Sequence, residues 1–506
     1  MSTIQTSIQP EELVEQLRDW QSYRLTRAAP VSVHETHISW IFLVGDHAYK
    51  VKKPIATDFL DYQTLENRKR YCEEEVRLDR RLAGDLYLDV VPITLDKGTV
   101  QVEGTGKPIE YAVKMRRFPH DSLLVERLEA GNVSQREVKD LAYKIANFHT
   151  NAAVSDLFEP YGTADRVLSD AIDNFQELQS VDLGESMKTI DRLEAWTHDF
   201  FANHENRFKA RSINGFIREC HGDLHAGNIV HFGDHFVPFD GIEFNESLRW
   251  IDVINDIAFL VMDFAAHDRT DLGSVLLNTY FEHTGDYEAI RLLRFYLVYR
   301  ALVRAKVAMI RARQRDPDQH ERQDDLDECV KHIEQAEAFS KPTSATLWIT
   351  HGVSGSGKTT RSEQFISTCQ AIRLRSDLER KRLYGLSPTD RPVEQQTSEL
   401  YGPTATQATY QRLEKLTADI LNAGISVIVD ATFLKQQQRS RFQRLADQFR
   451  VPFQIIDCET EEPELRRRME RRMAENSDAS DADLEVLEHQ LRTRERLSDR
   501  ESLAAV

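Results

Sequence analysis

The sequence predicts an α+β domain followed by an α/β domain with a parallel sheet and helices on both faces. Three differences along the chain indicate this fold class. Residues up to about 118 are rich in predicted strands, and helical periodicity dominates from about 119 to 340. After residue 346, short apolar strands alternate with helices, which favours a parallel sheet. We therefore predict domains at 1–340, with lobes at 1–118 and 119–340, and at 341–506.

The first lobe is expected to be a β-rich layer with one helix. The segments HISWIFLV and HAYKVKK flank a turn at Gly45-Asp46, and the turn signals DKG and GTGK separate VVPITL, TVQVE and IEYAVKM. The helix is predicted over DYQTLENRKRYCEEEVRLDRRLA. In the second lobe, the short strands NIVHF and HFVPFD interrupt the helices.

The second domain is expected to begin after a linker, SKPTSAT, at residues 340–346. The segments LWIT, AIRLRS, SVIVDA and FQIIDC predict its strands. Because helical segments separate them, these strands are expected to lie parallel in one sheet.

Composition and charge narrow the class of protein. The 506 residues carry a net charge of −18, which repels polyanions and disfavours nucleic-acid or anionic-membrane partners. The apolar segment at 291–310 contains four arginines and a lysine, too many for a membrane span. The N-terminus lacks a secretory pattern, and the five cysteines form no C-x-x-C pair, as expected for reduced thiols. We therefore expect a cytoplasmic protein without a membrane partner.

The stretch HGDLHAGNIV, residues 221–230, fits two kinds of site. A divalent-metal cage at its two histidines would need further ligands, and none occurs at a clear spacing. The stretch also fits H-x-D-x-x-x-x-N, which carries a base and a Mg²⁺ ligand in kinase-like phosphotransferases. We favour this interpretation, with Asp223 and Asn228 in the two roles. His221 is then expected to brace the loop, whereas His225 either braces it or contacts the substrate.

Two further segments meet the demands of phosphoryl transfer. VPFDGIEF places Asp240 after a short strand, where a second metal-binding carboxylate is needed. HAYKVKKP places Lys50 in a strand, in an A-x-K context suited to holding the α- and β-phosphates. The helix that follows offers Glu75 as the ion-pair partner of this lysine, with Glu73 and Glu74 as alternatives.

With these motifs, residues 30–310 resemble the aminoglycoside phosphotransferase/choline kinase branch of the kinase-like fold. The segments ISWIFLVGDHAYKVKKP, FLDYQTLENRKRYCEEEVRLDRRLA and YLDVVPI resemble a bacterial subfamily of this branch. The resemblance implies a bilobal, protein-kinase-like domain with Asp223 as the catalytic base. It also implies Asn228 and Asp240 as Mg²⁺ ligands, and Lys50 with Glu75 as the phosphate-anchoring pair. One departure is that no G-x-G-x-x-G precedes the lysine.

Two arginines of the apolar helix have an open role. Arg300 and Arg304 lie four positions apart, on one face of that helix. A buried arginine needs an anionic partner. We favour an internal aspartate in WIDVINDIAFLVMDF, at position 252, 256 or 263. In the alternative, the two arginines grip a phosphate or carboxylate of the substrate.

The second domain opens with a phosphate-binding loop. GVSGSGKTT fits G-x-x-x-x-G-K-[ST], follows a predicted strand and precedes a predicted helix. Backbone N–H groups of such a loop surround the β-phosphate, its lysine reaches the β- and γ-phosphates, and its threonine binds Mg²⁺. The expected nucleotide-binding residues are Gly352, Gly355, Gly357, Lys358, Thr359 and Thr360.

Residues 345–500 resemble small P-loop kinases of the polynucleotide kinase, zeta toxin and gluconate kinase type. The resemblance lies in RSDLERKRLYG, SVIVDATFL and LRRRMERR. It implies Asp377 as the base, Arg380 as a substrate contact and Asp430 as a Mg²⁺-ordering or substrate-binding group. Arg468 and Arg472 become lid arginines that neutralise the transferring phosphoryl group. Arg467 and Arg471 would serve equally well, and the alternative is an ordinary solvated helix.

These motifs together predict a bifunctional phosphotransferase that uses ATP and Mg²⁺. Each domain is expected to phosphorylate a hydroxyl group of a small-molecule acceptor, with sugars as one candidate class. Two alternatives stay open. The C-terminal domain could be a 5′-hydroxyl nucleic-acid kinase, or one half could be an ATP-gated regulatory module without catalysis. The sequence leaves the acceptors and the oligomeric state open.

Overall fold

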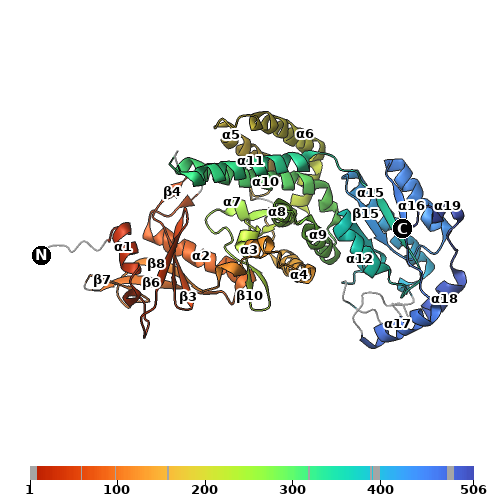
Figure 1. The fold of residues 1–506 in the computed structure, drawn as a ribbon, viewed down its shortest axis with the longest axis horizontal. Helices are drawn as coiled ribbons and strands as arrows, with labels where there is room; N and C mark the ends of the chain where they lie inside the picture. The colour runs from red at the N-terminus through yellow and green to blue at the C-terminus, as the bar shows by residue number, and fades with distance from the viewer. Residues whose placement is uncertain are drawn as a thin grey trace. The chain divides into compact units, whose positions relative to one another are not determined.

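The chain forms two compact units (Figure 1). A computed structural model describes residues 8–57, 60–96, 98–156, 159–316, 319–387, 390, 399–475 and 484–506. The first unit comprises Met1–Val167 and Phe208–Leu260, and the second comprises Leu168–Arg207 and Val261–Val506. The boundary predicted at 340/341 thus lies inside the second unit, because helices that precede it pack with the P-loop sheet.

A six-stranded antiparallel sheet forms the first part of unit 1, in the order β1-β2-β3-β8-β6-β7. Its strands are β1 (Val31–Glu35), β2 (Ser39–Val44), β3 (His47–Lys52), β6 (Tyr87–Asp96), β7 (Thr99–Val102) and β8 (Pro108–Arg116). All five predicted strands are present, and β1 is an addition. The short elements beside them are α1 (Pro10–Leu17), η1 (Trp20–Ser22), β4 (Ala56–Thr57) and β5 (Leu60–Asp61).

Helix α2 (Leu65–Ala83) packs on one face of this sheet. It begins later than predicted because Thr64 caps it, accepting a hydrogen bond from the Asn67 N–H at 3.1 Å. Cys72 and Val76 on its inner face are buried against Val113 of β8 and other sheet residues. This packing fixes the side chains of α2 that point toward β3.

The rest of unit 1 is a set of short hairpins and helices after the sheet. The β10–β11 hairpin and the β9–β12 pair frame the loop at 220–228, with η3 at its end. These elements are β9 (Ile217–Glu219), η3 (Ala226–Asn228), β10 (Ile229–Phe232), β11 (His235–Pro238), α7 (Glu246–Arg249) and β12 (Trp250–Asp252). The preceding segments are η2 (His120–Ser122), α3 (Leu124–Glu129) and α4 (Gln135–Asn151).

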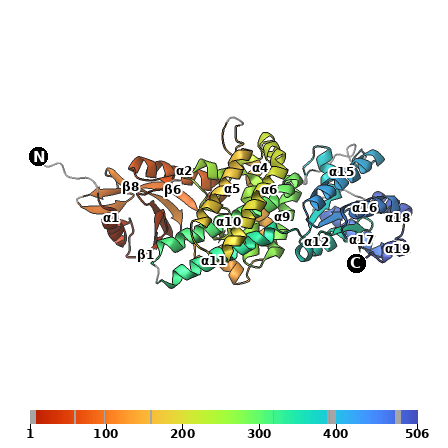
Figure 2. The same cartoon turned by 90° about the horizontal axis from the view of Figure 1, so that it is seen from above.

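Helices dominate the chain between α4 and the second sheet, apart from the short elements named above. Within unit 2, α10 and α11 run side by side (Figure 2) and are joined by ion pairs such as Arg311–Asp325 at 2.9 Å. The helices are α5 (Ala164–Gln179), α6 (Ser186–Ile213), α8 (Val253–Ala266), α9 (Thr270–Thr284), η4 (Tyr287–Ala289), α10 (Ile290–Gln314) and α11 (His320–Ser340). Among the described residues, every helix is too short or too polar to cross a membrane.

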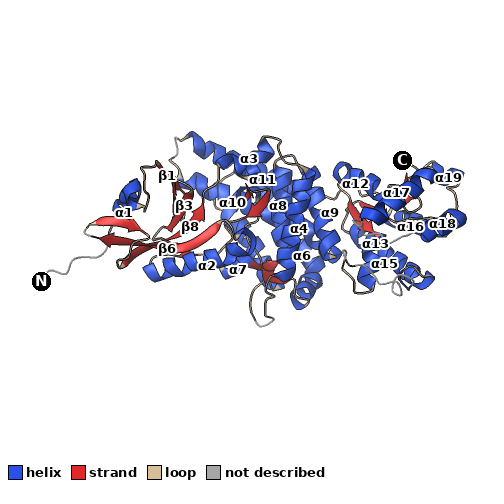
Figure 3. Ribbon diagram, turned by 90° about the horizontal axis from the view of Figure 1, so that it is seen from below, coloured by secondary structure: helices blue, strands red, loops and turns tan. Residues whose placement is uncertain are grey.

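The C-terminal part of unit 2 is a four-stranded parallel sheet in the order β14-β15-β13-β16, with helices around it (Figure 3). Its strands are β13 (Leu347–His351), β14 (Ile372–Arg375), β15 (Val427–Asp430) and β16 (Phe453–Asp457), the four that the sequence predicts. Its helices are α12 (Lys358–Cys369), α13 (Ser376–Leu383), α15 (Pro403–Asn422), α16 (Gln436–Phe449), α17 (Glu462–Glu475), α18 (Leu484–Thr493) and α19 (Asp499–Ser502). The α+β and α/β fold classes are therefore both confirmed.

Candidate active sites

Lys50 and Glu75 form a buried ion pair between β3 and α2. The Lys50 Nζ lies 3.0 Å from Glu75 Oε1, and the same ammonium also contacts the carboxylate of Asp240. Burial lowers the pKa of Lys50, but Asp240 and Glu75 outweigh it and hold that pKa well above its usual value. The competing residue Glu73 is exposed and pairs with Lys69, so α2 presents Glu75 to the sheet.

A second lysine, Lys52, shares the carboxylate of Glu75. Its Nζ lies 2.7 Å from Glu75 Oε2 and also contacts Glu243, which in turn accepts a hydrogen bond from Tyr62. Burial raises the pKa of Glu75, but Lys50 and Lys52 outweigh it and hold that pKa below its usual value. Sequence patterns do not indicate this network, because Lys52 looks like an ordinary strand residue.

The HGDLHAGN loop brings Asp223 and Asn228 into contact. The Asn228 side-chain amide donates to the Asp223 carboxylate at 2.9 Å and to the Asp223 carbonyl at 3.1 Å. The Asp223 side chain stays 37% exposed, so an acceptor can reach it. The carboxylate and amide oxygens of this loop are the ligand types that Mg²⁺ prefers.

His221 uses both ring nitrogens to hold the backbone of the loop. Its Nε2 lies 2.9 Å from the Phe239 carbonyl, and its Nδ1 lies 3.3 Å from the Asp223 N–H. This pattern fits a neutral ring with the proton on Nε2, and burial lowers the pKa of His221 accordingly. Neither nitrogen is free for a metal, which disfavours the cage interpretation.

Asp256 of α8 fixes the start of the same loop. Its carboxylate accepts the N–H groups of His221 at 3.0 Å and Gly222 at 2.9 Å, and contacts His149 Nε2 at 3.0 Å. Gly222 has a φ of +87°, and a Cβ there would lie 2.8 Å from the Leu248 carbonyl. The sequence suggested Asp256 only as a partner for an arginine, and its loop-bracing role becomes visible only in the structure.

His225 lies at the other end of the loop. Its Nδ1 accepts the Gly227 N–H at 3.1 Å, and its Nε2 lies 3.5 Å from Asp223 Oδ2. The ring packs against Phe259, with centroids 5.4 Å apart. The histidine therefore has structural contacts and also lies beside the candidate base.

Asp240 has an unusual backbone conformation. Its φ of +62° is uncommon outside glycine, and such conformations gather at functional sites. The hydroxyl of Tyr87 lies 3.1 Å from its N–H, and Asp79 accepts the N–H of the following Gly241 at 2.9 Å. Burial raises the pKa of Asp79 well above its usual value. These contacts aim the Asp240 carboxylate, which is 41% exposed, at Lys50.

The P-loop lies in unit 2, between β13 and α12. Gly352 has a φ of +145°, and a Cβ there would meet Ser356 Oγ at 2.5 Å and the Cys458 carbonyl at 2.7 Å. Gly357 caps α12 in the left-handed conformation, without a side-chain cap. The first N–H groups of α12 therefore point into the loop, which fits a phosphate group.

The remaining P-loop side chains line a cleft of about 2220 Å³ at the carboxyl ends of the strands. Lys358 donates to the Val353 carbonyl at 2.8 Å, and Thr359 and Thr360 lie beside it in the cleft lining. Asp430 ends β15 and lies 3.4 Å from the Ser362 hydroxyl, one turn into α12. Gly355 completes the loop, with a φ of +83°.

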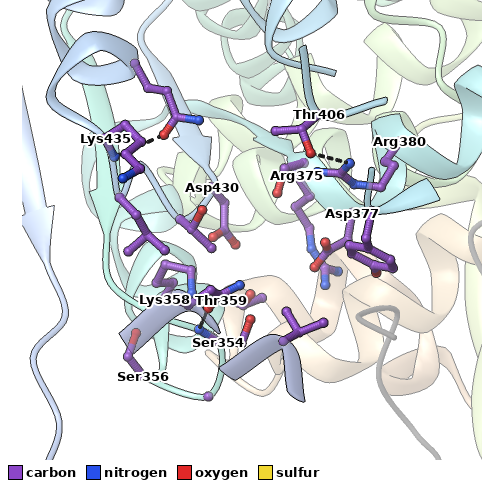
Figure 4. A pocket seen from close by; sticks show the side chains of 18 of the residues that line it. Ser354, Ser356, Lys358, Thr359, Arg375, Asp377, Arg380, Thr406, Asp430 and Lys435 are labelled. Atoms are coloured by element: carbon purple, nitrogen blue, oxygen red, sulfur yellow. Dashed lines mark hydrogen bonds between the residues drawn. The ribbon is translucent and has the colours of Figure 1, made fainter. Parts of the chain in front are cut away.

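Asp377 and two arginines lie on another wall of this cleft (Figure 4). Burial raises the pKa of Asp377, and Arg375 and Arg380 oppose that effect. Arg380 donates to the Leu400 carbonyl at 2.7 Å and to the Thr406 hydroxyl at 3.4 Å. Arg375, at the end of β14, also lines the cleft and was not among the residues that the sequence predicted for this site.

The arginines of α17 divide by their orientation. Arg468 and Arg471 line the cleft, and Arg468 Nη1 lies 3.5 Å from the Gly355 carbonyl. Arg467 is 75% exposed and pairs with Glu464. Arg472 belongs to α17, but its side chain lies outside the described residues. The structure thus brings Arg468 and Arg471 to the P-loop.

The two arginines of α10 have different surroundings. Arg304 pairs with Glu328 of α11 at 3.2 Å, so the expectation of an aspartate partner from residues 250–264 is wrong for this arginine. One of those aspartates, Asp252, pairs instead with Arg211. Arg300 is buried in α10. A substrate role for either arginine stays a prediction.

One further contact at the P-loop had no signal in the sequence. The side-chain carbonyl of Gln490, in α18, accepts the Ser354 N–H at 2.7 Å. A helix close to the C-terminus thus reaches back to the loop that opens the domain. Sequence patterns do not reveal such long-range contacts.

A known protein family matches the C-terminal part of the chain. Residues 347–497 match the family model AAA_33, described as an AAA domain, which confirms the P-loop family predicted for this part. The chain is 31% identical over 451 residues to "Uncharacterized protein Rv2004c" of Mycobacterium tuberculosis, covering 89% of this chain and 88% of that protein. "Uncharacterized protein Mb2027c" of Mycobacterium bovis matches with the same identity and coverage.

Two solved structures are similar to separate parts of the chain. A choline/ethanolamine kinase family protein from Mesorhizobium loti is 13% identical, with a TM-score of 0.37, covering 61% of this chain and 92% of its own. A gluconokinase from Sinorhizobium meliloti is 19% identical, with a TM-score of 0.23, covering 33% of this chain and 82% of its own.

Proposed function

The chain belongs to the family that includes Rv2004c of Mycobacterium tuberculosis, and we propose that it is a phosphotransferase with two separate ATP sites. Each site transfers the γ-phosphoryl group of ATP to a hydroxyl group of a small-molecule acceptor. Both sites use Mg²⁺, which neutralises charge on the phosphates when it is bound.

In the first site, Lys50 contacts the nucleotide phosphates while Glu75 holds its ammonium in place. Asn228 and Asp240 supply the oxygen ligands for the metal. Asp223 orients the acceptor hydroxyl and takes its proton. The hydrogen bond from Asn228 fixes the Asp223 carboxylate for that task.

In the second site, the loop around Gly357 and the start of α12 hold the phosphates, and Lys358 contacts the β- and γ-phosphates. Thr359 binds the metal, with Asp430 behind it. Asp377 takes the acceptor proton, and Arg380 contacts the acceptor. The cleft-lining arginines of α17 neutralise the transferring group.

One observation carries the proposal: each nucleotide motif lies beside a carboxylate that a sensor of ATP would not need. Asp223 lies in the loop that holds Asn228, and Asp377 lines the same cleft as Lys358. Two partly exposed carboxylates at two nucleotide motifs favour transfer over binding alone.

A metabolite screen with labelled ATP tests the proposal. Wild-type full-length protein is compared with the Lys50→Ala and Lys358→Ala variants, so that each labelled product is assigned to one site. We expect at least one product to disappear with each variant. A screen in which the wild type labels no acceptor, while still binding Mg·ATP, would favour the regulatory alternative.

A second candidate for the P-loop site is a kinase of nucleic-acid 5′-hydroxyls. Basic side chains outnumber acidic ones in the cleft lining, although the chain carries a net charge of −18. The basic residues are Lys358, Arg361, Arg375, Arg380, Lys435, Arg441, Arg444, Arg468 and Arg471. Binding of an oligonucleotide that weakens steeply with added salt would support this candidate. Salt-independent labelling of a neutral metabolite would oppose it.

A further inference from the structure

Helix α9 supplies a side chain to the edge of the P-loop sheet. Strand β14 is the outermost strand of that sheet, beside β15. The Asn278 amide donates to the Ala371 carbonyl at 2.9 Å and accepts the Arg373 N–H at 2.6 Å. One side chain thus satisfies a donor and an acceptor that an edge strand otherwise leaves open. The helix lies on the N-terminal side of the predicted boundary at 340/341.

One turn further along α9, Glu282 holds two arginines of the same strand. Its Oε1 lies 2.7 Å from Arg373 Nη2 and 2.8 Å from Arg373 Nε, and its Oε2 lies 3.6 Å from Arg375 Nη1. The Glu282 backbone carbonyl also accepts a hydrogen bond from Arg382 of α13. The carboxylate is buried, so its hydrogen bonds to the guanidinium groups are protected from water.

Arg373 carries this contact to the P-loop helix. It is 6% exposed, and its Nη1 donates to the Thr359 carbonyl at 3.2 Å and to the Ser362 hydroxyl at 3.3 Å. The Ser362 hydroxyl in turn lies 3.4 Å from the Asp430 carboxylate. A continuous set of contacts therefore leads from Glu282 to the first turn of α12.

Arg375 carries the second contact into the cleft. Its side chain lines the cleft together with Asp377, the candidate base (Figure 4). The arginine is the first of three cations, with Arg380 and Lys358, that oppose the effect of burial on the pKa of Asp377. Through these two arginines, Glu282 is therefore connected to the phosphate-binding turn of the second site and to the cleft wall that carries the candidate base.

We propose that Glu282 is a positioning residue of the P-loop site, acting through Arg373 on Thr359 and through Arg375 on the wall beside Asp377. The inference rests on the nucleotide site proposed above. A buried arginine that loses its carboxylate must find another partner or move toward water. Either change would shift the first turn of α12, where small displacements are costly for phosphate and metal binding. The site is thus completed by a helix outside 341–506.

Hydrogen exchange of the full-length protein, measured without nucleotide, tests whether Glu282 holds the first turn of α12 through Arg373. In Glu282→Gln, we expect faster exchange both at residues 357–363 and at residues 371–377. Asn278→Ala should accelerate only 371–377, because it removes the strand contacts and leaves Arg373 paired. Glu288→Gln is the matched control, since Glu288 is 67% exposed and lies 3.9 Å from Lys415. Wild-type exchange at 357–363 in Glu282→Gln would overturn the proposal.

Titration with Mg·ATP then separates positioning from a loss of stability. The Mg·ATP binding that is lost in Lys358→Ala is the part of the total binding that belongs to the P-loop site. We expect Glu282→Gln to weaken that share by about 10–100-fold, as is usual for groups that orient a ligand-binding side chain. Asn278→Ala should weaken it far less, even where its melting temperature falls as much. If Glu282→Gln and Asn278→Ala lost Mg·ATP affinity only in proportion to the fall in their melting temperatures, the proposal would be overturned.

The two measurements also separate this inference from the proposed function. If wild type and Lys358→Ala bound Mg·ATP equally, the nucleotide site would be wrong. The exchange rates at 357–363 would still decide whether Glu282 holds the first turn of α12.

Discussion

The ammonium of Lys50 contacts the carboxylate of Asp240, although 190 positions separate the two residues in the chain. The contact places the candidate phosphate anchor beside the candidate metal ligand, and Glu75 holds the lysine from the other side at 3.0 Å. Phosphoryl transfer needs such a cation and such a carboxylate near the same phosphates. The P-loop cleft contains a separate set, with Lys358 and Asp430. The two candidate sites lead to the first prediction.

Each site should depend on its own lysine. Lys358→Ala is expected to remove nucleotide binding at the P-loop site only, and Lys50→Ala at the first site only, because each ammonium is proposed to contact phosphates at a different site. Nucleotide titration of the full-length variants gives the number of sites that remain. Lys69→Ala, a change of an exposed lysine, serves as the control. Loss of both sites in either variant would contradict the two-site model.

Glu75 should matter for stability as well as for binding. Glu75→Gln leaves two buried ammonium groups with a weaker partner, and breaking a buried pair costs about 3–5 kcal/mol. Glu73→Gln, on the exposed face of the same helix, should change the free energy of unfolding by less than about 0.5 kcal/mol. Urea unfolding of both variants makes the comparison. Equal effects would show that the buried network contributes little.

The ion pairs of Glu75 also predict how the stability difference between wild type and Glu75→Gln depends on pH. The pKa of Glu75 is lower in the folded state, so its stabilisation is present above the pKa of an unfolded glutamate, about 4.3. The stabilisation is lost as the pH falls through the lower folded pKa. The difference between wild type and Glu75→Gln should therefore shrink on acidification below that range. A difference that stays constant down to unfolding would argue against a charged Glu75.

The acid limb of the second activity should lie above the usual range of an aspartate. Burial raises the pKa of Asp377, and a base must be unprotonated to act, so activity should fall at a higher pH than for an exposed aspartate. Arg375→Gln removes a charge that opposes this rise and should move the limb higher still. Arg467→Gln, outside the cleft lining, should leave it unchanged. The measurement is kcat/KM against pH with the acceptor from the screen, and an unmoved limb in Arg375→Gln would contradict the assignment.

Local signals explain why so much of the fold could be predicted. The strand that ends at Asp430 is a short apolar run, and the strand that carries Lys50 follows the turn at Gly45-Asp46, so composition and turn residues locate them. Strand β1 was not predicted because none of its five residues is buried: two are half-buried and the others are exposed. Helix α2 begins later than predicted because the Thr64 side chain caps its N-terminus, so that Leu65 is the first helical residue.

Long-range contacts explain why parts of the sites could not be predicted. Asp223 and Asn228 lie five positions apart in the chain, so a short sequence motif is enough to find them. Asp256, Lys52 and Glu282 act through residues far away in the chain, and their types are common in ordinary helices and strands. The lid arginines depend on packing in the same way, and among the described side chains of α17 Arg468 and Arg471 line the cleft.

His221 should not bind zinc. Both of its ring nitrogens contact backbone groups of the loop, and a metal would have to displace one of these contacts. We expect metal analysis of the purified protein to give no stoichiometric zinc that depends on this histidine. Stoichiometric zinc that is lost in His221→Ala, but retained in the exposed-residue control His320→Ala, would revive the metal cage.

The last prediction concerns the division of labour between the two bases. Asp223→Asn and Asp377→Asn should each abolish one phosphoryl transfer and leave folding and ATP binding nearly intact, because an amide has the shape of the carboxylate but takes no proton. Loss of general-base help costs about 10²–10⁴ in rate. Asn228→Ala and Asp240→Asn should instead weaken the use of Mg·ATP in the first site, since they remove the proposed metal ligands.

The two base variants should be independent of each other. Phosphate transfer by wild type, both single variants and the double variant, measured with each acceptor, decides the matter. Asp223→Asn is expected to leave the product of the second site unchanged, and Asp377→Asn that of the first, because each candidate base lies beside a different motif. If Asp223→Asn retained every transfer at the wild-type rate, the first site would be a binding module. The same result for Asp377→Asn would reduce the P-loop site to a nucleotide sensor.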